Sequence, residues 1–261
     1  MPSIRPNFNK AASQYNAHAA LQEEVAFRLS EKLNVISIDP IVMIDLGAGT
    51  GLLSEKLSKK CPKSHLICVD FAQQSLRANT NNHNVCANAY QLPFADKSVD
   101  FIASSLMMQW CTDLKGLFEE CHRVLKPGGL MLFSTFGPDT LKELKRSWSV
   151  VDSEPHVNSF TDMHDVGDQM LQSGFNSPIM EMETLTLTYD KAVDLMRDLK
   201  GIGAQTVHNR SKSLTGKTKF KKMIEMYESF RNEGKLPATY EVIYGHAWKS
   251  ENSLGSIALD S

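Results

Sequence analysis

The stretch from Ile41 to Leu53, I-V-M-I-D-L-G-A-G-T-G-L-L, decides the fold. It starts as a run of apolar residues typical of a buried strand, and then breaks into Gly47, Gly49 and Gly51 before helical sequence resumes. Glycine lets the backbone approach a ligand closely, and the N–H groups at the start of the next helix point toward it. The stretch therefore predicts a strand-to-helix turn that binds a cofactor.

The spacing around this turn narrows the choice of cofactor. The dinucleotide-binding fingerprint requires a glycine three residues after Gly49, where this chain has Leu52, and no Gly-Lys-Ser or Gly-Lys-Thr loop follows. The next predicted strand ends at Asp70, where a carboxylate can accept hydrogen bonds from both ribose hydroxyl groups. Taken alone, Asp70 could equally cap a helix that begins at Phe71. Together with the turn, it favours an adenosine ligand.

Short apolar runs alternate with helical stretches along the first half of the chain, which predicts a parallel sheet with helices on both faces. The strands are expected near 41–46, 65–70, 84–87, 99–104, 129–136, 179–189 and 240–248. Helices are expected over 11–33, after Pro138, and over 161–173, 190–201 and 216–233. We therefore predict an α/β fold with a seven-stranded, mostly parallel sheet and a helical insertion before the last strand.

The 261 residues are expected to form one domain with three additions. A helical cap is expected over about 8–34, because its apolar residues recur at roughly helical spacing. A basic helical insertion over about 190–237 should cover one edge of the site, and a tail rich in Ser and Gly over about 250–261 should fray.

The composition excludes several classes of protein. A net charge of −2 argues against general attraction to nucleic acid. Five cysteines without a C-x-x-C pair argue against a disulfide scaffold or a zinc site, and no histidine has convincing metal-ligand spacing. The first twenty residues have no apolar core, and no apolar run approaches the ~20 residues needed to span a bilayer. We expect a soluble, cytoplasmic protein without a metal, a membrane anchor or a nucleic-acid partner.

Three motifs carry a resemblance to a known superfamily. Asp45 followed by G-x-G-x-G resembles motif I of the class I methyltransferases, and H-R-V-L-K-P-G-G (122–129) matches their helix, turn and following strand. The stretch A-N-A-Y-Q-L-P-F-A-D-K-S-V-D-F-I (87–102) resembles their adenine-binding segment, with Asn88 where an acidic residue is usual. The amide oxygen of Asn88 could accept from the adenine amino group, or Asn88 could be a turn residue.

The resemblance implies a Rossmann-like class I fold and S-adenosylmethionine as the co-substrate. The cofactor-binding residues that this resemblance implies are Asp45, Gly47, Gly49, Gly51, Asp70, Asn88, Ala89 and Ser104. Gln22 of the predicted cap is a further candidate.

From about Phe8 to Trp248 the chain resembles the malonyl-acyl carrier protein O-methyltransferases of biotin synthesis. The motifs that carry this resemblance are S-Q-Y-N-A-H-A-A-L-Q (13–22), L-M-M-Q-W-C (106–111), F-G-P-D-T-L-K-E-L (136–144), F-T-D-M-H-D-V-G-D (160–168), L-M-R-D-L-K-G-I-G-A (195–204) and L-P-A-T-Y-E-V-I-Y-G-H-A-W (236–248). The resemblance implies methylation of the free carboxylate of a malonyl thioester on acyl carrier protein, giving the methyl ester that primes pimeloyl synthesis.

A carboxylate acceptor is already ionised at neutral pH and needs no general base. Tyr15 is the first choice for a residue that faces the substrate, although it could be a core aromatic. Gln22 could contact the cofactor or lie on the surface. Gln109 and Trp110 follow the fourth strand, where open parallel sheets bind ligands, although Trp110 could simply pack. We expect His164 to be a helix-start residue held by Asp165 rather than a catalytic group.

Acyl carrier proteins are strongly acidic, and one segment of this chain has the matching charge. Residues 197–235 contain ten Lys or Arg against four acidic residues. The candidate docking residues are Arg197, Lys200 and Arg210, although a run of charge is usually just a solvated face. Two rival functions stay open: methylation of another small acid or lipid-like acceptor, and a non-catalytic subunit that binds the same cofactor.

Overall fold

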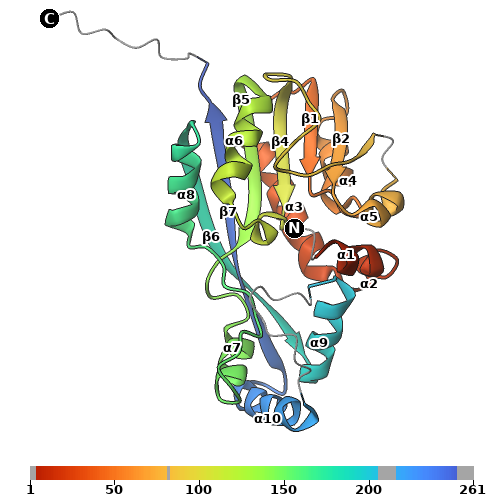
Figure 1. Cartoon of the computed structure of the whole chain (residues 1–261), viewed down its shortest axis with the longest axis vertical. Coiled ribbons are helices and arrows are strands. Elements are labelled where there is room, and N and C mark those ends of the chain that lie inside the picture. Colours follow the sequence, from red (N-terminus) through yellow and green to blue (C-terminus); the bar gives the residue numbers. More distant parts are fainter. Residues whose placement is uncertain (1–3, 81–82, 205–215, 252–261) are drawn as a thin grey trace, which may run out of the picture.

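The computed structural model describes residues 4–80, 83–204 and 216–251. Its strands are β1 (Val42–Leu46), β2 (His65–Asp70), β3 (Asn84–Cys86), β4 (Val99–Ser105), β5 (Leu125–Phe136), β6 (Phe175–Tyr189) and β7 (Leu236–Lys249). They form one sheet in the order β3-β2-β1-β4-β5-β7-β6, in which β7 runs in the opposite direction to the other six strands (Figure 1). The predicted seven-stranded, mostly parallel sheet is confirmed.

Three strands begin four residues earlier than predicted: β5 at Leu125, β6 at Phe175 and β7 at Leu236. Each of these starts contains a proline and other residues typical of turns, which hid the pairing from the sequence. In β6 the pairing is also interrupted by a register shift between Asn176 and Ile179.

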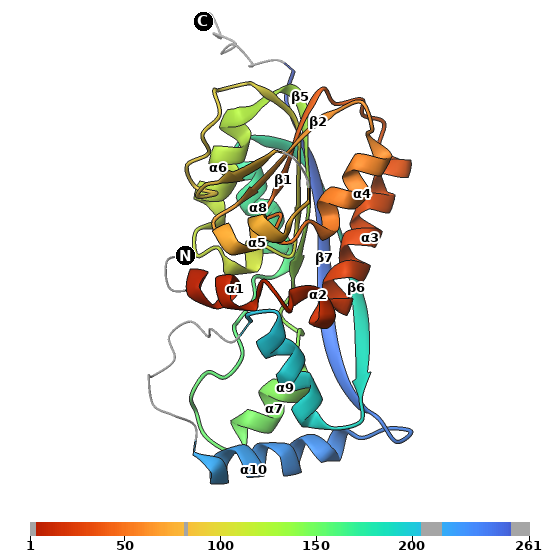
Figure 2. The ribbon, with the colours of Figure 1, turned by 90° about the vertical axis from the view of Figure 1, so that its right-hand side faces the viewer.

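The helices are α1 (Arg5–Ala11), α2 (Tyr15–His18), α3 (Ala20–Glu31), α4 (Leu52–Lys60), α5 (Gln73–Ala78), α6 (Leu114–Val124), α7 (Lys142–Ser149), α8 (Met163–Gln172), α9 (Ala192–Gly201) and α10 (Lys217–Tyr227), with short 3-10 helices η1 (Lys32–Asn34), η2 (Met108–Trp110) and η3 (Glu228–Phe230). Helices α3 and α4 cover one face of the sheet, and α6 and α8 cover the other (Figure 2). Both faces of the central strands are therefore buried.

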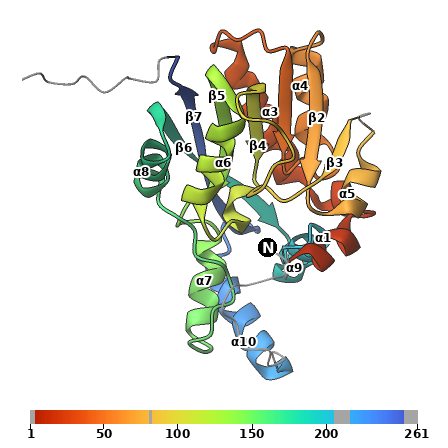
Figure 3. The same cartoon turned by 45° about the horizontal axis from the view of Figure 1, so that its top comes forward.

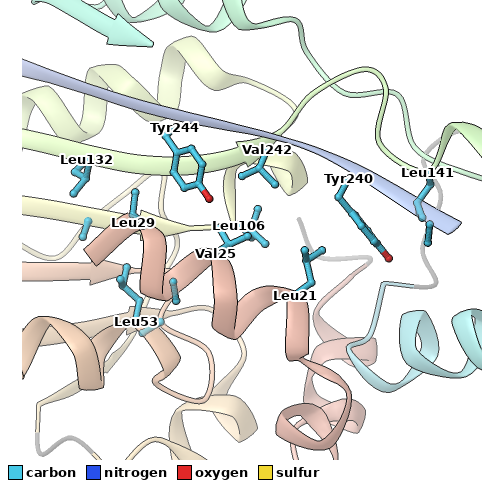
Figure 4. Packing of buried hydrophobic residues seen from close by; sticks show 14 of the residues in the cluster. Leu21, Val25, Leu29, Leu53, Leu106, Leu132, Leu141, Tyr240, Val242 and Tyr244 are labelled. Carbon is cyan, nitrogen blue, oxygen red and sulfur yellow. The ribbon is translucent and has the colours of Figure 1, made fainter. Parts of the chain in front are cut away.

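Helix α3 shows how the sequence specifies one of these layers. Leu21, Val25 and Leu29 recur every four residues and so share one face of the helix. All three are buried and point toward side chains of the sheet such as Val242 and Tyr244 (Figure 4). Burying a side chain of this size stabilises the fold by about 1.5–3 kcal/mol.

The N-terminal cap differs from the expectation of one helix or a helix pair over 11–33. It consists of three helices and begins at Arg5, because Pro6 in the first turn suits a helix start. Ala19 separates α2 from α3, since its backbone (φ −99°, ψ 28°) leaves the helical region. The short helices α1 and α2 thus lie across the end of the sheet rather than along it (Figure 2).

Strands β6 and β7 continue well beyond the rest of the sheet and carry the insertion, which consists of α9 and α10 (Figure 1). Helix α7 packs against α10 and β7, and the buried Glu143 of α7 accepts hydrogen bonds from the backbone N–H and the hydroxyl group of Thr239. Helix α9 lies beside the N-terminal cap (Figure 3), where His18 Nδ1 is 2.8 Å from Asp198 Oδ1. The predicted insertion before the last strand is confirmed; residues 252–261 of the predicted tail lie outside the described residues.

Candidate active site

Two cavities meet where the carboxyl ends of the parallel strands face the N-terminal cap. The first is called the loop cavity because the glycine-rich turn lines it together with Asp70 and Phe71. The second is called the outer chamber and lies toward the insertion. The residues that line both cavities are Phe8, Tyr15, Leu106 and Trp110.

The glycine-rich turn presents bare backbone to the loop cavity. Gly49 has a φ of +54°, in the left-handed region, and a Cβ placed there would meet nothing closer than 4.0 Å. Gly47, in contrast, is closely packed, because a Cβ there would lie 2.4 Å from the side chain of Met107. Gly51 is the N-cap of α4. The turn thus leaves open space for a ligand at Gly49 while its flanks are closely packed.

Asp70 holds the turn in place from the neighbouring strand. Its Oδ2 accepts the N–H of Gly49 at 2.9 Å and its Oδ1 accepts the N–H of Ala72 at 2.7 Å. Burial raises the pKa of Asp70, although these N–H groups oppose the rise. The carboxylate also lines the loop cavity, and each oxygen can still accept a second hydrogen bond. Asp70 therefore lines the loop cavity and also makes a cap-like contact just before α5.

Asp45 and Ser104 lie behind the turn rather than in either cavity. Asp45 is buried and accepts a hydrogen bond from the hydroxyl group of Ser54. Burial, and then the charge of Asp70, raise the pKa of Asp45 to about 7. Ser104 Oγ donates to the carbonyl oxygen of Leu46 at 2.7 Å. Both residues support the glycine-rich turn, whereas the neighbouring Ser105, which the sequence did not single out, lines the loop cavity.

The predicted adenine-binding segment reaches the loop cavity through its small residues. Ala87 and Ala89 line the cavity. The side chain of Asn88 is exposed, and its Oδ1 accepts the backbone N–H of Tyr90 at 3.2 Å, as in a turn. The contact between Asn88 and adenine stays a prediction.

The N-terminal cap closes the loop cavity with aromatic side chains and one polar contact. Phe8 makes edge-to-face contacts with Trp110 and Phe71, at centroid distances of 5.3 and 6.2 Å. Thr50 of the turn donates to Asn16 Oδ1 at 2.7 Å. These contacts join α1 and α2 to the turn, so the cap forms part of the site.

Tyr15 lies where the two cavities meet. Burial and the nearby charge of Asp70 raise the pKa of its hydroxyl group well above the ordinary value of 10. The phenol therefore keeps its proton at neutral pH and can donate a hydrogen bond.

Two glutamine side chains present unpaired acceptors in the same region. Gln22 and Gln109 each have a buried Oε1 without a hydrogen-bond partner among the described residues. Gln109 is held by a bond from its Nε2 to the carbonyl oxygen of Leu106 at 2.6 Å, so its oxygen is the unpaired atom. Gln22 lines the outer chamber and a small cavity beside the turn. Because buried polar atoms normally have partners, both oxygens are suited to bind a ligand donor.

The outer chamber has mostly apolar walls, formed largely by aromatic and aliphatic side chains such as Phe136, Phe160 and Tyr240. His156 also lines it and was missed by the sequence analysis, because it lies in an irregular segment between α7 and α8. Its ring stacks on Trp148, with a centroid distance of 3.6 Å.

Two of the candidate docking residues, Arg197 and Lys200, lie on α9, whose C-terminal end contributes Leu199 to the outer chamber. Arg197 is 65% exposed and pairs with Asp194 at 2.7 Å, and Lys200 is exposed. Arg210 lies outside the described residues.

His164 lies in the first turn of α8, as predicted, and its side chain is exposed. Its Nδ1 is 2.9 Å from Asp162 Oδ1, so the expectation that Asp165 would hold it was wrong. The cap residue of a helix precedes it, and here Asp162 also accepts the N–H of His164. Among the described residues, no group of three or more His, Cys, Asp or Glu side chains could hold a metal ion. In the same ranges, no helix is both long and apolar enough to cross a membrane.

The fold and the site define the class as a Rossmann-like, S-adenosylmethionine-dependent methyltransferase. Residues 44–133 match the methyltransferase domain family. The fold is similar to that of the YcgJ protein of Bacillus subtilis, with a TM-score of 0.61 at 16% identity over 86% of this chain and 98% of that chain. It is also similar to phosphoethanolamine N-methyltransferase 2 of Haemonchus contortus in complex with S-adenosyl-L-methionine, with a TM-score of 0.58 at 14% identity over 93% of this chain and 57% of that chain.

A curated relative places the chain more narrowly. The malonyl-[acyl-carrier protein] O-methyltransferase of Gallionella capsiferriformans is 44% identical over 95% of this chain and 90% of its own length. The chain belongs to this family of O-methyltransferases. The resemblance stated from the sequence motifs is confirmed.

Proposed function

We propose that this protein transfers the methyl group of S-adenosylmethionine to the free carboxylate of a malonyl thioester carried on acyl carrier protein. The observation that carries the proposal is the meeting of the two cavities at Tyr15, Leu106 and Trp110. One cavity has the backbone and the carboxylate that suit an adenosyl ligand, and the other has a mainly apolar wall that suits an acyl group. The family relationship supports the same acceptor.

The loop cavity fits S-adenosylmethionine in its donor and acceptor groups. Asp70 would accept hydrogen bonds from the ribose hydroxyl groups, and Ala87 and Ala89 leave room beside the adenine. The unpaired Oε1 of Gln22 would accept from the methionyl ammonium group, because Gln22 also lines the small cavity beside Gly47 and Thr50. When bound, the sulfonium supplies an activated methyl group.

The reaction itself needs little chemistry from the chain. A carboxylate oxygen forms a bond to the methyl carbon while the carbon–sulfur bond breaks, so the products are a methyl ester and S-adenosylhomocysteine, with no proton transferred. A general base is therefore unnecessary. The protonated phenol of Tyr15 would donate to the second carboxylate oxygen and orient it, while Trp110 and Phe8 keep water out.

An acidic carrier protein would dock on the basic side of the insertion, near Arg197 and Lys200. Charges at a rim mainly accelerate encounter and make it sensitive to salt. Reversing both charges should slow the reaction with malonyl-carrier protein without changing cofactor binding. An unchanged rate at low ionic strength would refute this docking surface.

The proposal is tested by incubating the purified protein with S-adenosylmethionine and malonyl-carrier protein and weighing the carrier by mass spectrometry. We expect a gain of one methyl group, placed on the malonyl carboxylate by fragmentation. Free malonate and malonyl-coenzyme A are the parallel substrates. Methylation of free malonate alone would favour the rival small-acid function, and cofactor binding without any methylated product would favour a non-catalytic subunit.

A further inference from the structure

The outer chamber is lined almost entirely by side chains that carry no charge, although the proposed substrate is an anion. Among the residues that the structure describes, His156 is the only lining side chain that can carry a positive charge, and no acidic side chain lines the chamber. Burying an unpaired carboxylate in such surroundings is costly. A malonyl carboxylate entering the chamber therefore needs a partner, and His156 is the group placed to supply the charge.

His156 is held in one orientation by its neighbours. Its side chain is only 4% exposed and lies flat on Trp148, with an interplanar angle of 5°. Its Nε2 is 2.8 Å from Asp152 Oδ1, and Asp152 Oδ2 is 2.8 Å from the ammonium group of Lys219 in α10. A polar chain thus runs from the basic helix α10 to the wall of the chamber.

The neighbours also fix which nitrogen of His156 carries a proton. Lys219, and then His156, lower the pKa of Asp152 to about 2, so Asp152 stays a carboxylate and accepts from Nε2. Nδ1 is the remaining nitrogen, and it becomes a donor only when the ring is protonated. The other ionisable groups that line the chamber are Tyr15 and Tyr240, and burial raises both of their pKa values. Both phenols stay neutral at physiological pH.

We propose that His156, as an imidazolium, pairs with the malonyl carboxylate in the outer chamber and thereby selects the free acid over its methyl ester. Asp152 and Lys219 act as positioning residues for the ring. This inference rests on the proposed function and identifies the group that recognises the charged end of the substrate.

The test compares His156→Asn with His164→Asn. His164 is a matched control because it also contacts an aspartate, at 2.9 Å, but it is 83% exposed and lines neither cavity. For His156→Asn we expect the KM for malonyl-carrier protein to rise about 10- to 100-fold, the range that a charged hydrogen bond accounts for. The Kd for the methyl-ester carrier and the Kd for S-adenosylmethionine should stay within about twofold. His164→Asn should change none of these values.

A second measurement does not depend on how a variant folds. Calorimetry of the wild-type protein loaded with S-adenosylhomocysteine compares its Kd for malonyl-carrier protein with its Kd for the methyl-ester carrier. We expect the malonyl carrier to bind about 10- to 100-fold more tightly. Equal affinities for the two carriers in the wild-type protein, or equal losses of affinity for acid and ester in His156→Asn, would overturn the inference. A wild-type protein that does not methylate the malonyl carrier would instead refute the proposed function.

Discussion

Replacing Asp70 by asparagine should weaken cofactor binding far more than it weakens the fold. The carboxylate accepts two backbone N–H groups, at 2.9 and 2.7 Å, and still has capacity for two ribose hydroxyl groups. Asparagine has the same shape but only one acceptor oxygen, so its amide group would face a backbone donor. The loss of one charged hydrogen bond to ribose is worth about 1.5–3 kcal/mol, which corresponds to a Kd raised about 10- to 100-fold.

Stability should respond differently, because burial raises the pKa of Asp70 and the buried charge is therefore a net cost to the folded state. Removing that charge partly offsets the lost backbone hydrogen bond. We expect the free energy of unfolding of Asp70→Asn to change by less than about 1.5 kcal/mol, the contribution of a typical hydrogen bond. A raised Kd with an unchanged free energy of unfolding would show that Asp70 binds the ligand rather than stabilising the fold.

The assay is titration calorimetry with S-adenosylmethionine, paired with denaturant unfolding. Asp100 offers a matched control, because it also accepts two backbone N–H groups, from Ile41 and Val42, and lies at the opposite end of β1. Although burial acts to raise it, the pKa of Asp100 is lowered, chiefly by Lys126 and the N–H of Val42. Asp100→Asn should therefore reduce stability without changing the Kd. A wild-type Kd for Asp70→Asn, or the same Kd for both variants, would refute the assignment of Asp70.

Three further substitutions test the glycine-rich turn, the buried Asp45 behind it, and the contact between α9 and the N-terminal cap. Gly49→Ala places a side chain at a φ of +54°, a strain of about 1–2 kcal/mol, and calorimetry should show at least tenfold weaker cofactor binding. The pKa of Asp45 rises from 3.8 to about 7 on folding, so the folded state binds this proton more tightly than the unfolded state does. The free energy of unfolding of the wild-type protein should therefore fall by up to about 4 kcal/mol between pH 4 and 7 and then level off. Denaturant unfolding at pH 5 and pH 8 should show a smaller difference for Asp45→Asn than for the wild-type protein. Gly201→Ala puts a methyl group 2.2 Å from the His18 ring, which should cost about 1–3 kcal/mol of stability. Hydrogen exchange of the backbone amides in α2 should therefore accelerate. Unchanged exchange would show that α9 does not hold the cap.

The sequence predicted the sheet and the glycine-rich turn because both are encoded locally. Apolar runs broken by glycine specify the end of β1, and Asp70 was predictable since the end of the next strand fixes its place. The mostly parallel direction of the strands followed from their alternation with helices, whereas their order in the sheet came only from the structure.

The direction of side chains within buried strands was not predictable in the same way. Because both faces of β1 and β4 are covered, their sequences are mainly apolar and carry no regular alternation that marks one face. Ser104 and Ser105 differ by one position, and only the second lines the loop cavity. Asp45 likewise turned out to contact Ser54 behind the turn.

His156 escaped prediction for a different reason. It lies in an irregular segment with no period, and its partners, Asp152 and Lys219, are brought together only when α10 packs near α7. Contacts of this kind depend on tertiary structure, and a single histidine in a loop gives no pattern to detect.

The chemistry of the proposed reaction explains why one tethered histidine suits this chamber better than a fixed strong cation. A sulfonium and a carboxylate carry opposite charges that disappear as the methyl group moves, so the transition state is less charged than the bound reactants. Apolar walls such as Phe136 and Phe160 favour that state, whereas a cation that grips the carboxylate tightly would stabilise the reactants more. His156 can hold the anion through one ring nitrogen only, because its Nε2 already contacts Asp152. On this reasoning His156→Asn should raise KM while leaving kcat equal to or above that of the wild type, and a large fall in kcat would contradict it.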